Sequence, residues 1–372
     1  MARPFLSSMS NALNSSESLI GQAEVLNRLE QILCEGRAQS ILFLGPRGSG
    51  RHSLARAAAK ALLCEEPHTA LRACDHCPSC RYFEAQAHPD FKEIDQGEDK
   101  VIKVERLRRE VLADLPMKPQ ISRVKVTLID GDVLNEQGQN ALLKSLEEPP
   151  AGTIFFLTGE RSDVFLPTIL SRSVLISPRL LTPEEIRALL HSRGFEEENE
   201  IALSFSAGIP GRALELAGDE RVAALREQAV MVLTSCPELN PLQSMEKIQP
   251  LLSESKEHWL LFLDFLQSAL RDLALLLAES DTKVSFRLLN EDKRGELRAF
   301  LQKMPQDCPA RRLDAAMQGL ISLRKAEAAH VNFELASWQL QLLLTECFEA
   351  KGEKYGKSHR SATPRAGESL VF

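Results

Sequence analysis

The chain has 372 residues, of which 44% are apolar and 26% charged, so its composition is that of a globular protein with room for two or three domains. The formal net charge of −7 at pH 7 argues against a protein that grips nucleic acid over its whole surface. The chain contains no apolar run of 18 or more residues, so we expect no membrane span. The segment near the start lacks the apolar core of a signal peptide, and we therefore expect a cytoplasmic protein.

The first half of the chain alternates between strand and helix patterns. Residues 1–18 are rich in Ser and Asn and predict a flexible N-terminus, after which apolar residues recur at helical spacing up to Gly36. A strand, a glycine-rich loop and a helix are expected over residues 41–63, and the apolar runs DFKEID, VKVTLID and GTIFFLTG predict further strands between helices. This alternation implies a parallel sheet with helices on both faces, an α/β domain over residues 19–178.

The second half of the chain predicts helices only. The strands end after TILSRSVLISP, and Thr182 as N-cap with Pro183 at the first helical position begins a small helical domain, expected over residues 179–220. Long amphipathic patterns predict an all-α domain over residues 221–350. The last segment, residues 351–372, carries mixed charges without periodicity and predicts a disordered tail.

The segment ILFLGPRGSGRHS matches a phosphate-binding loop except at two positions. Gly45, Gly48 and Gly50 allow backbone N–H groups to wrap a phosphate at the positive end of the following helix. The pattern requires a lysine and then a hydroxyl residue after the last glycine, whereas this chain has Arg51 and His52. A guanidinium is a poor substitute for a compact ammonium, and an imidazole is a poor Mg²⁺ ligand. The loop therefore predicts the fold more strongly than it predicts hydrolysis.

The strand VTLIDGD places Asp130 where a carboxylate that orients Mg²⁺ is expected. An ATPase would follow it with a glutamate that activates water, but Gly131 stands there. Asp132 is one position late and, with the geometry of a strand end, would point elsewhere. Alternatively, the two aspartates only begin a turn. Together with the missing lysine and hydroxyl, this favours a site that no longer hydrolyses a nucleotide, and it leaves open whether the site still binds one.

A cysteine-rich insertion occupies residues 64–80. Its four cysteines form two overlapping C-x-x-C pairs and one more distant member: Cys64, Cys74, Cys77 and Cys80. This spacing predicts tetrahedral Zn²⁺ held by four thiolates, with no open position, and thus a structural ion. His68 and His76 are possible substitute ligands, and four ordinary thiols are the alternative.

Two further motifs make the chain similar to a known family. QNALLKSLEEPP and TILSRS, together with the glycine loop, resemble the bacterial DNA polymerase III clamp-loader subunits of the AAA+ superfamily. The resemblance implies a RecA-like AAA+ domain, a helical lid and an all-α C-terminal collar domain. In that family the gamma and tau ATPases keep an intact phosphate loop and an Asp-Glu pair, whereas delta-prime has a degraded nucleotide site. This chain follows the delta-prime pattern.

The resemblance also implies roles for single residues. Arg172 matches the arginine of a Ser-Arg-Cys motif that reaches the ATP of a neighbouring subunit, although Ser173 replaces the cysteine here. From the residues alone, a surface ion pair of Arg172 is the alternative. Arg212, in GIPGRAL, matches a sensor arginine of the lid and is either a remnant or an interface charge, and Thr158 or Gly159 matches a polar sensor at a strand end. The family carries the same cysteine insertion, which favours zinc.

The resemblance finally implies partners. They are the gamma or tau ATPase and the delta subunit in a hetero-oligomer of the DNA-directed DNA polymerase III holoenzyme, and through it the sliding clamp and primed DNA. Two alternatives differ in class: an active gamma- or tau-like ATPase with an unusual loop, and a zinc-dependent nucleic-acid-binding module. The charged helix VIKVERLRREV gives little support to a nucleic-acid-binding module, because its acidic residues interleave with the basic ones.

Overall fold

A computed structural model describes most of the chain between residues 19 and 348. The described segments are residues 19–35, 38–66, 71–95, 101–195, 199–239, 241–282, 285–305, 307–328 and 332–348. The expected flexible N-terminus, the expected tail and His68 lie outside them. The chain divides into two compact units, Met1–Glu220 and Arg221–Phe372.

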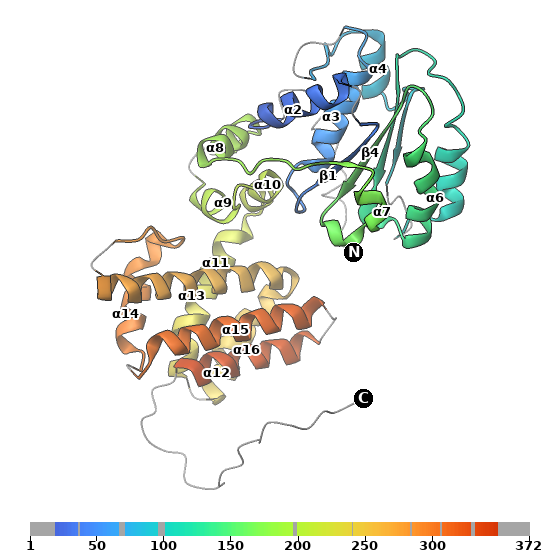
Figure 1. The fold of residues 1–372 in the computed structure, drawn as a ribbon. Coiled ribbons are helices and arrows are strands. Elements are labelled where there is room, and N and C mark those ends of the chain that lie inside the picture. The colour runs from blue at the N-terminus through green and yellow to red at the C-terminus, as the bar shows by residue number, and fades with distance from the viewer. Residues whose placement is uncertain are drawn as a thin grey trace. The chain divides into compact units, whose positions relative to one another are not determined.

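The described part of the first unit is built around one parallel sheet of five strands in the order β2-β3-β4-β1-β5 (Figure 1). The strands are β1 (Ser40–Leu44), β2 (Phe91–Ile94), β3 (Lys125–Asp130), β4 (Thr153–Gly159) and β5 (Val174–Ile176). Every neighbouring pair is parallel, and in the central pair Leu42 of β1 lies opposite Leu157 of β4. The predicted α/β fold with a parallel sheet is confirmed.

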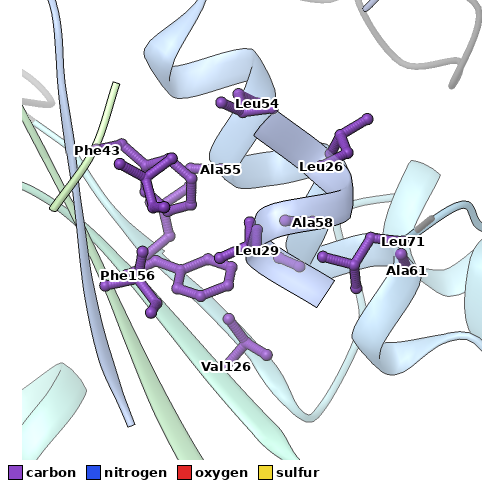
Figure 2. Close-up of a cluster of buried hydrophobic side chains, with 14 of the residues drawn as sticks. Leu26, Leu29, Phe43, Leu54, Ala55, Ala58, Ala61, Leu71, Val126 and Phe156 are labelled. Carbon is purple, nitrogen blue, oxygen red and sulfur yellow. The ribbon is translucent and has the colours of Figure 1, made fainter. Parts of the chain in front are cut away.

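Helices cover both faces of this sheet because its strands are apolar on both sides. One face packs against α2 (Ala23–Cys34), α3 (Arg51–Leu63) and α4 (Pro78–Glu84). Figure 2 shows this core, in which the rings of Phe43 and Phe156 meet edge to face with centroids 5.1 Å apart. The opposite face packs against α5 (Val104–Leu107), the π-helical turn η3 (Arg108–Leu112), α6 (Glu136–Glu147) and α7 (Pro167–Leu170). Each fully buried Leu, Ile or Phe contributes about 1.5–3 kcal/mol to this core.

Three short helices complete the first unit: α8 (Pro183–Ser192), α9 (Glu200–Phe205) and α10 (Pro210–Gly218). The predicted N-cap of α8 is confirmed, since the Thr182 side chain accepts from the N–H of Glu185 while the Glu185 carboxylate accepts from the N–H of Thr182. The chain between β5 and α8 runs beside the start of α2, where the Gln22 side chain bonds the backbone of Arg179 in both directions.

The described part of the second unit contains helices only. They are α11 (Arg221–Ser235), η6 (Cys236–Glu238), α12 (Pro241–Glu254), η7 (Ser255–His258), α13 (Trp259–Thr282), η8 (Glu291–Lys293), α14 (Arg294–Lys303), α15 (Pro309–Ala328) and α16 (Phe333–Phe348). Figure 1 shows α13, α15 and α16 running alongside one another. Within the described residues of both units, no helix combines the length and apolar character needed to cross a membrane.

Candidate functional site

The glycine loop has the backbone of a phosphate-binding loop. It connects the end of β1 to the first residue of α3, and Gly48 and Gly50 adopt φ angles of 80° and 86°. These left-handed conformations favour glycine and turn the chain sharply into the helix. The loop therefore aims the N-terminus of a 13-residue helix at the space above it, as the sequence pattern predicts.

A side chain of the chain itself lies across this loop. Arg51 donates from Nη1 to the carbonyl oxygen of Gly45 at 2.6 Å, and its Nη2 lies 2.5 Å from Oδ2 of Asp132. Both charged side chains are largely shielded from water, with 17% and 24% of their surfaces exposed. The guanidinium thus bridges the loop and the end of β3.

The expectation that Asp132 points elsewhere is wrong. It assumed the extended geometry of a strand end, but the chain leaves β3 at Asp130 and enters a 3₁₀ turn, η4 (Gly131–Val133), which turns Asp132 back toward the loop. Its second oxygen accepts from the N–H of Glu160 at 2.7 Å. Asp130 is the last residue of β3. Burial and the negative charge of the neighbouring Asp132 both raise the pKa of Asp130.

His52 does not face the loop's phosphate position. Its Nε2 lies 2.8 Å from Oε1 of Glu93 on β2, and the same carboxylate is paired with Arg56. Burial would raise the pKa of Glu93, but the hydrogen bond from His52 and the charge of Arg56 hold it below its usual value. Position 52 therefore offers no hydroxyl ligand for Mg²⁺. Arg51 stands where a lysine would bind the outer phosphates, and it is paired within the chain. These residues do not fit Mg²⁺-bound nucleotide.

Helix α10 packs directly against the glycine loop. The N–H of Gly211 donates to the carbonyl oxygen of Gly48 at 2.8 Å, and a Cβ at Gly211 would lie 2.7 Å from the Gly48 Cα. Beside this contact a cavity of about 270 Å³ is lined by the loop, by Leu19 and Ile20 and by Leu181 and Leu189. Arg212 follows on the first turn of α10, half-buried, with its backbone N beside Gly48.

The four predicted cysteines lie together at the end of α3. All four Sγ atoms are within 4.8 Å of one another, with 3.9 Å between Cys64 and Cys77 and 3.9 Å between Cys74 and Cys80. Tetrahedral zinc with Zn–S bonds of about 2.3 Å requires sulfur atoms about 3.8 Å apart, whereas a disulfide requires about 2.05 Å. The cluster is therefore able to hold a metal ion.

Backbone N–H groups surround these sulfur atoms. The amides of Cys74, Cys77 and Cys80 donate to the Sγ atoms of Cys64, Cys74 and Cys77, at 3.3, 3.3 and 3.4 Å. Burial opposes ionisation of Cys77, but hydrogen bonds from the backbone N–H groups of Cys80 and Glu65 and from the neighbouring thiols lower the pKa of its thiol to about 7. His76 lies at the rim, exposed, with Nε2 3.3 Å from Glu66, so the four sulfur atoms form a set without it.

The cysteine module is fastened to the C-terminal end of α3. Ser79 donates to the carbonyl oxygen of Leu63 at 2.5 Å, and Ser122 donates to the same oxygen at 3.0 Å. His88, buried between the two hydroxyls, accepts the N–H of Asp90 on Nδ1. On the other side of the helix Lys60, 6% exposed, lies 2.5 Å from Asp75 and also pairs with Glu84.

Arg172 lies in the turn between α7 and β5. Its Nη2 is 2.6 Å from Oε1 of Glu147, and its Nη1 donates to the carbonyl oxygen of Thr168 at 3.0 Å. The side chain is 35% exposed. Ser173, which replaces the family's cysteine, shares a hydrogen bond of 2.8 Å with Ser40 of β1.

Several contacts of the site are not evident in the sequence. Gln139 is 3% exposed on α6 and bonds the backbone of Val164 and Leu166, which leads into α7. Thr158, at the predicted sensor position, is buried and lies 3.5 Å from Oδ1 of Asp130. Neither partnership joins residues close in sequence, so no local pattern could have revealed it.

Comparison with known proteins decides the family. A family model described as "DNA polymerase III, delta subunit" matches residues 21–180. The chain is 30% identical over 227 residues to DNA polymerase III subunit delta' of Escherichia coli K12, an alignment that covers 59% of this chain and 67% of that protein. The chain belongs to the DNA polymerase III clamp-loader subunits of the AAA+ type. This confirms the resemblance seen in the motifs.

Two more relatives represent both branches of this family. The delta' subunit of Pseudomonas aeruginosa is 33% identical over 213 residues, which are 55% of this chain and 63% of that protein. The tau subunit of Salmonella typhimurium is 40% identical over 171 residues, 45% of this chain and 26% of tau. The chain thus spans less than two thirds of the length of each of these two relatives. Both branches, delta' and tau, belong to the clamp-loader family.

Proposed function

We propose that this chain is a delta-prime-like, non-hydrolysing subunit of a clamp loader. The observation that carries the proposal is the ion pair of Arg51 with Asp132, in which the chain's own cation and carboxylate satisfy each other at the nucleotide site. Two further parts of the hydrolytic machinery are missing: His52 stands where a hydroxyl residue is needed, and Gly131 stands where a glutamate is needed. The glycine loop and Asp130 then serve the fold and its interfaces.

The second part of the proposal is that Arg172 acts on a neighbour. Its guanidinium is partly exposed on a turn whose backbone is fixed, which is what an arginine finger acting in trans requires. The neighbour is a gamma or tau ATPase, assembled with delta, and the complex opens the sliding clamp and loads it at primed DNA. Arg212, on the lid, is proposed as an interface charge of the same assembly.

Zinc is the metal that we propose for the cysteine cluster. Four sulfur donors in a closed set suit Zn²⁺, and the fastening of the module to α3 gives the ion a structural role. The all-α second unit is proposed as the collar domain of the assembly, and α8 to α10 as the lid.

Two measurements test the functional proposal. The purified chain alone is expected to show no ATP turnover, whereas a loader reconstituted with clamp and primed DNA should lose about tenfold or more of its turnover with Arg172→Ala. Arg161→Ala is the matched control, because Arg161 is 72% exposed and pairs only with the nearby Asp163 among the described residues. Equal turnover of the Arg172→Ala and wild-type loaders would remove the finger from the proposal.

A second candidate is an active gamma- or tau-like ATPase. The 40% identity to tau of Salmonella typhimurium over 171 residues favours it. It predicts steady ATP turnover by the chain alone, which Asp130→Asn abolishes. The internally paired Arg51 speaks against it, and the same assay of the isolated chain separates the two candidates.

A further inference from the structure

We propose that Glu147 is a positioning residue that holds Arg172 against its own subunit and so sets how readily the finger reaches a neighbour's nucleotide. The inference rests on the proposed trans role of Arg172. It concerns a contact within this chain, between the last residue of α6 and the turn after α7.

Both terminal nitrogens of Arg172 are engaged within the chain. Nη2 lies 2.6 Å from Oε1 of Glu147, and Nη1 donates to Thr168 O at 3.0 Å and to Ser171 Oγ at 3.3 Å. A guanidinium binds a phosphate group best through two parallel N–H donors. Arg172 must therefore give up its pair with Glu147 before it engages a neighbour's phosphate in this way.

The pair with Glu147 is one that can be exchanged. Both side chains are partly exposed, 35% for Arg172 and 47% for Glu147, so water solvates each charge once they separate. Ion pairs in such surroundings shift an equilibrium by a factor of only about 1.5 to 5. The larger negative charge of a nucleotide's phosphate chain favours its exchange for the single carboxylate of Glu147.

The backbone that carries Arg172 stays in place during such an exchange. The amide of Gln139 donates to Val164 O at 2.9 Å and accepts from the N–H of Leu166 at 2.8 Å, which fixes the entry into α7. The N–H of Arg172 in turn donates to Ile169 O at 3.1 Å. Helix α6 thus anchors the segment through a buried glutamine and the guanidinium through a glutamate at its end, so that only the arginine side chain has to move.

The test uses the reconstituted loader with clamp and primed DNA, and measures kcat/KM for ATP. Glu147→Gln is expected to raise it by a factor of about 1.5 to 5, because the competing charge is gone. Glu148→Gln is the matched control: this neighbour is exposed and has no ion-pair partner in the described part of the chain, so its substitution should change nothing. In the Arg172→Ala background, Glu147→Gln should have no effect.

The outcomes separate this inference from the proposed function. If Arg172→Ala slows the loader but Glu147→Gln leaves kcat/KM unchanged or lowers it, the holding role of Glu147 is wrong and the finger stands. A rise that persists without Arg172 also overturns the inference, since Glu147 would then act through another group. If Arg172→Ala itself has no effect, the proposed function fails, whatever Glu147→Gln does.

Discussion

The Nη2 atom of Arg51 lies 2.5 Å from Oδ2 of Asp132, and this pair joins the glycine loop to the end of β3. In a hydrolytic site of this fold a bound Mg²⁺-nucleotide makes that connection. Here the side chains of Arg51 and Asp132 make this connection. Asp132 also accepts the N–H of Glu160, which follows β4, and so extends the connection to that strand. The loop, β3 and β4 are thus held together without a ligand, through Arg51 and Asp132.

Replacing the paired arginine should restore part of the site. The double variant Arg51→Lys/His52→Thr supplies a compact ammonium and a hydroxyl, and we expect it to bind Mg²⁺-ATP about tenfold more tightly than wild type, without turnover. Isothermal titration calorimetry of the purified chain measures both affinities. Arg47→Lys, which lies in the same loop but outside the pair, is the control. Equal affinity of wild type and the double variant would show that the pair does not exclude nucleotide.

The contact of α10 with the glycine loop leads to a prediction about packing. A Cβ at Gly211 would lie 2.7 Å from the Gly48 Cα and 2.9 Å from its carbonyl oxygen, so Gly211→Ala should destabilise the first unit by about 1–3 kcal/mol. Thermal unfolding followed by circular dichroism measures the loss. Gly295→Ala is the control, because Gly295 is also helical but a Cβ added there would meet nothing within 4 Å, and alanine should stabilise by up to about 1 kcal/mol. Similar shifts for both variants would contradict a tight contact.

The sequence was sufficient for the features that depend on local patterns. Mostly apolar runs marked the strands, because a sheet covered on both faces buries most of the side chains of its strands. The N-cap at Thr182 and the cysteine spacing were equally visible, since their partners lie within a few residues or in one short insertion.

The features that the sequence did not reveal all depend on tertiary contacts. Asp132 turns toward Arg51 only because β3 ends at Asp130 and a 3₁₀ turn follows. Glu147 reaches Arg172 only because α6 ends where the turn after α7 passes. The motif QNALLKSLEEPP identified the family, but which of its residues bond the chain elsewhere became visible only in the folded structure.

Removing the proposed metal should loosen the first unit. We expect one zinc ion per chain by elemental analysis, and a loss of more than about 4 kcal/mol of stability with Cys80→Ser or after chelation. The reason is that the module holds the end of α3 through Ser79 and Lys60, and these contacts need an ordered module. Cys308→Ser is the control, because Cys308 is an exposed free thiol in the second unit. If the chain without zinc melts at the same temperature as before, the cluster does not stabilise the fold by binding a metal ion.

Asp90 makes a prediction about acid stability. Its carboxylate is fully buried and accepts the N–H groups of Gln120, Ile121 and Ser122 at 2.6, 2.9 and 2.7 Å. Burial would raise the pKa of Asp90, but these three donors and His88 hold it below its usual value. A depressed pKa in the folded state stabilises the protein above the unfolded pKa of about 3.9, and this contribution is lost as the pH falls through the folded value.

Asp90→Asn should therefore lower the free energy of unfolding by about 2–3 kcal/mol at neutral pH, because an amide nitrogen replaces one of the accepting oxygens. Urea unfolding at a series of pH values measures the gap between variant and wild type. The gap should be constant from about pH 5 to 8 and narrow below about pH 4, where Asp90 of the unfolded wild-type chain begins to protonate, until the pH falls below the depressed pKa of the folded carboxylate. Asp163→Asn should show a much smaller effect, because the ion pair of Asp163 with Arg161 is largely exposed to water. A gap as large at pH 3 as at pH 7 would mean that the shape of the side chain, and not its charge, holds the segment between η3 and β3.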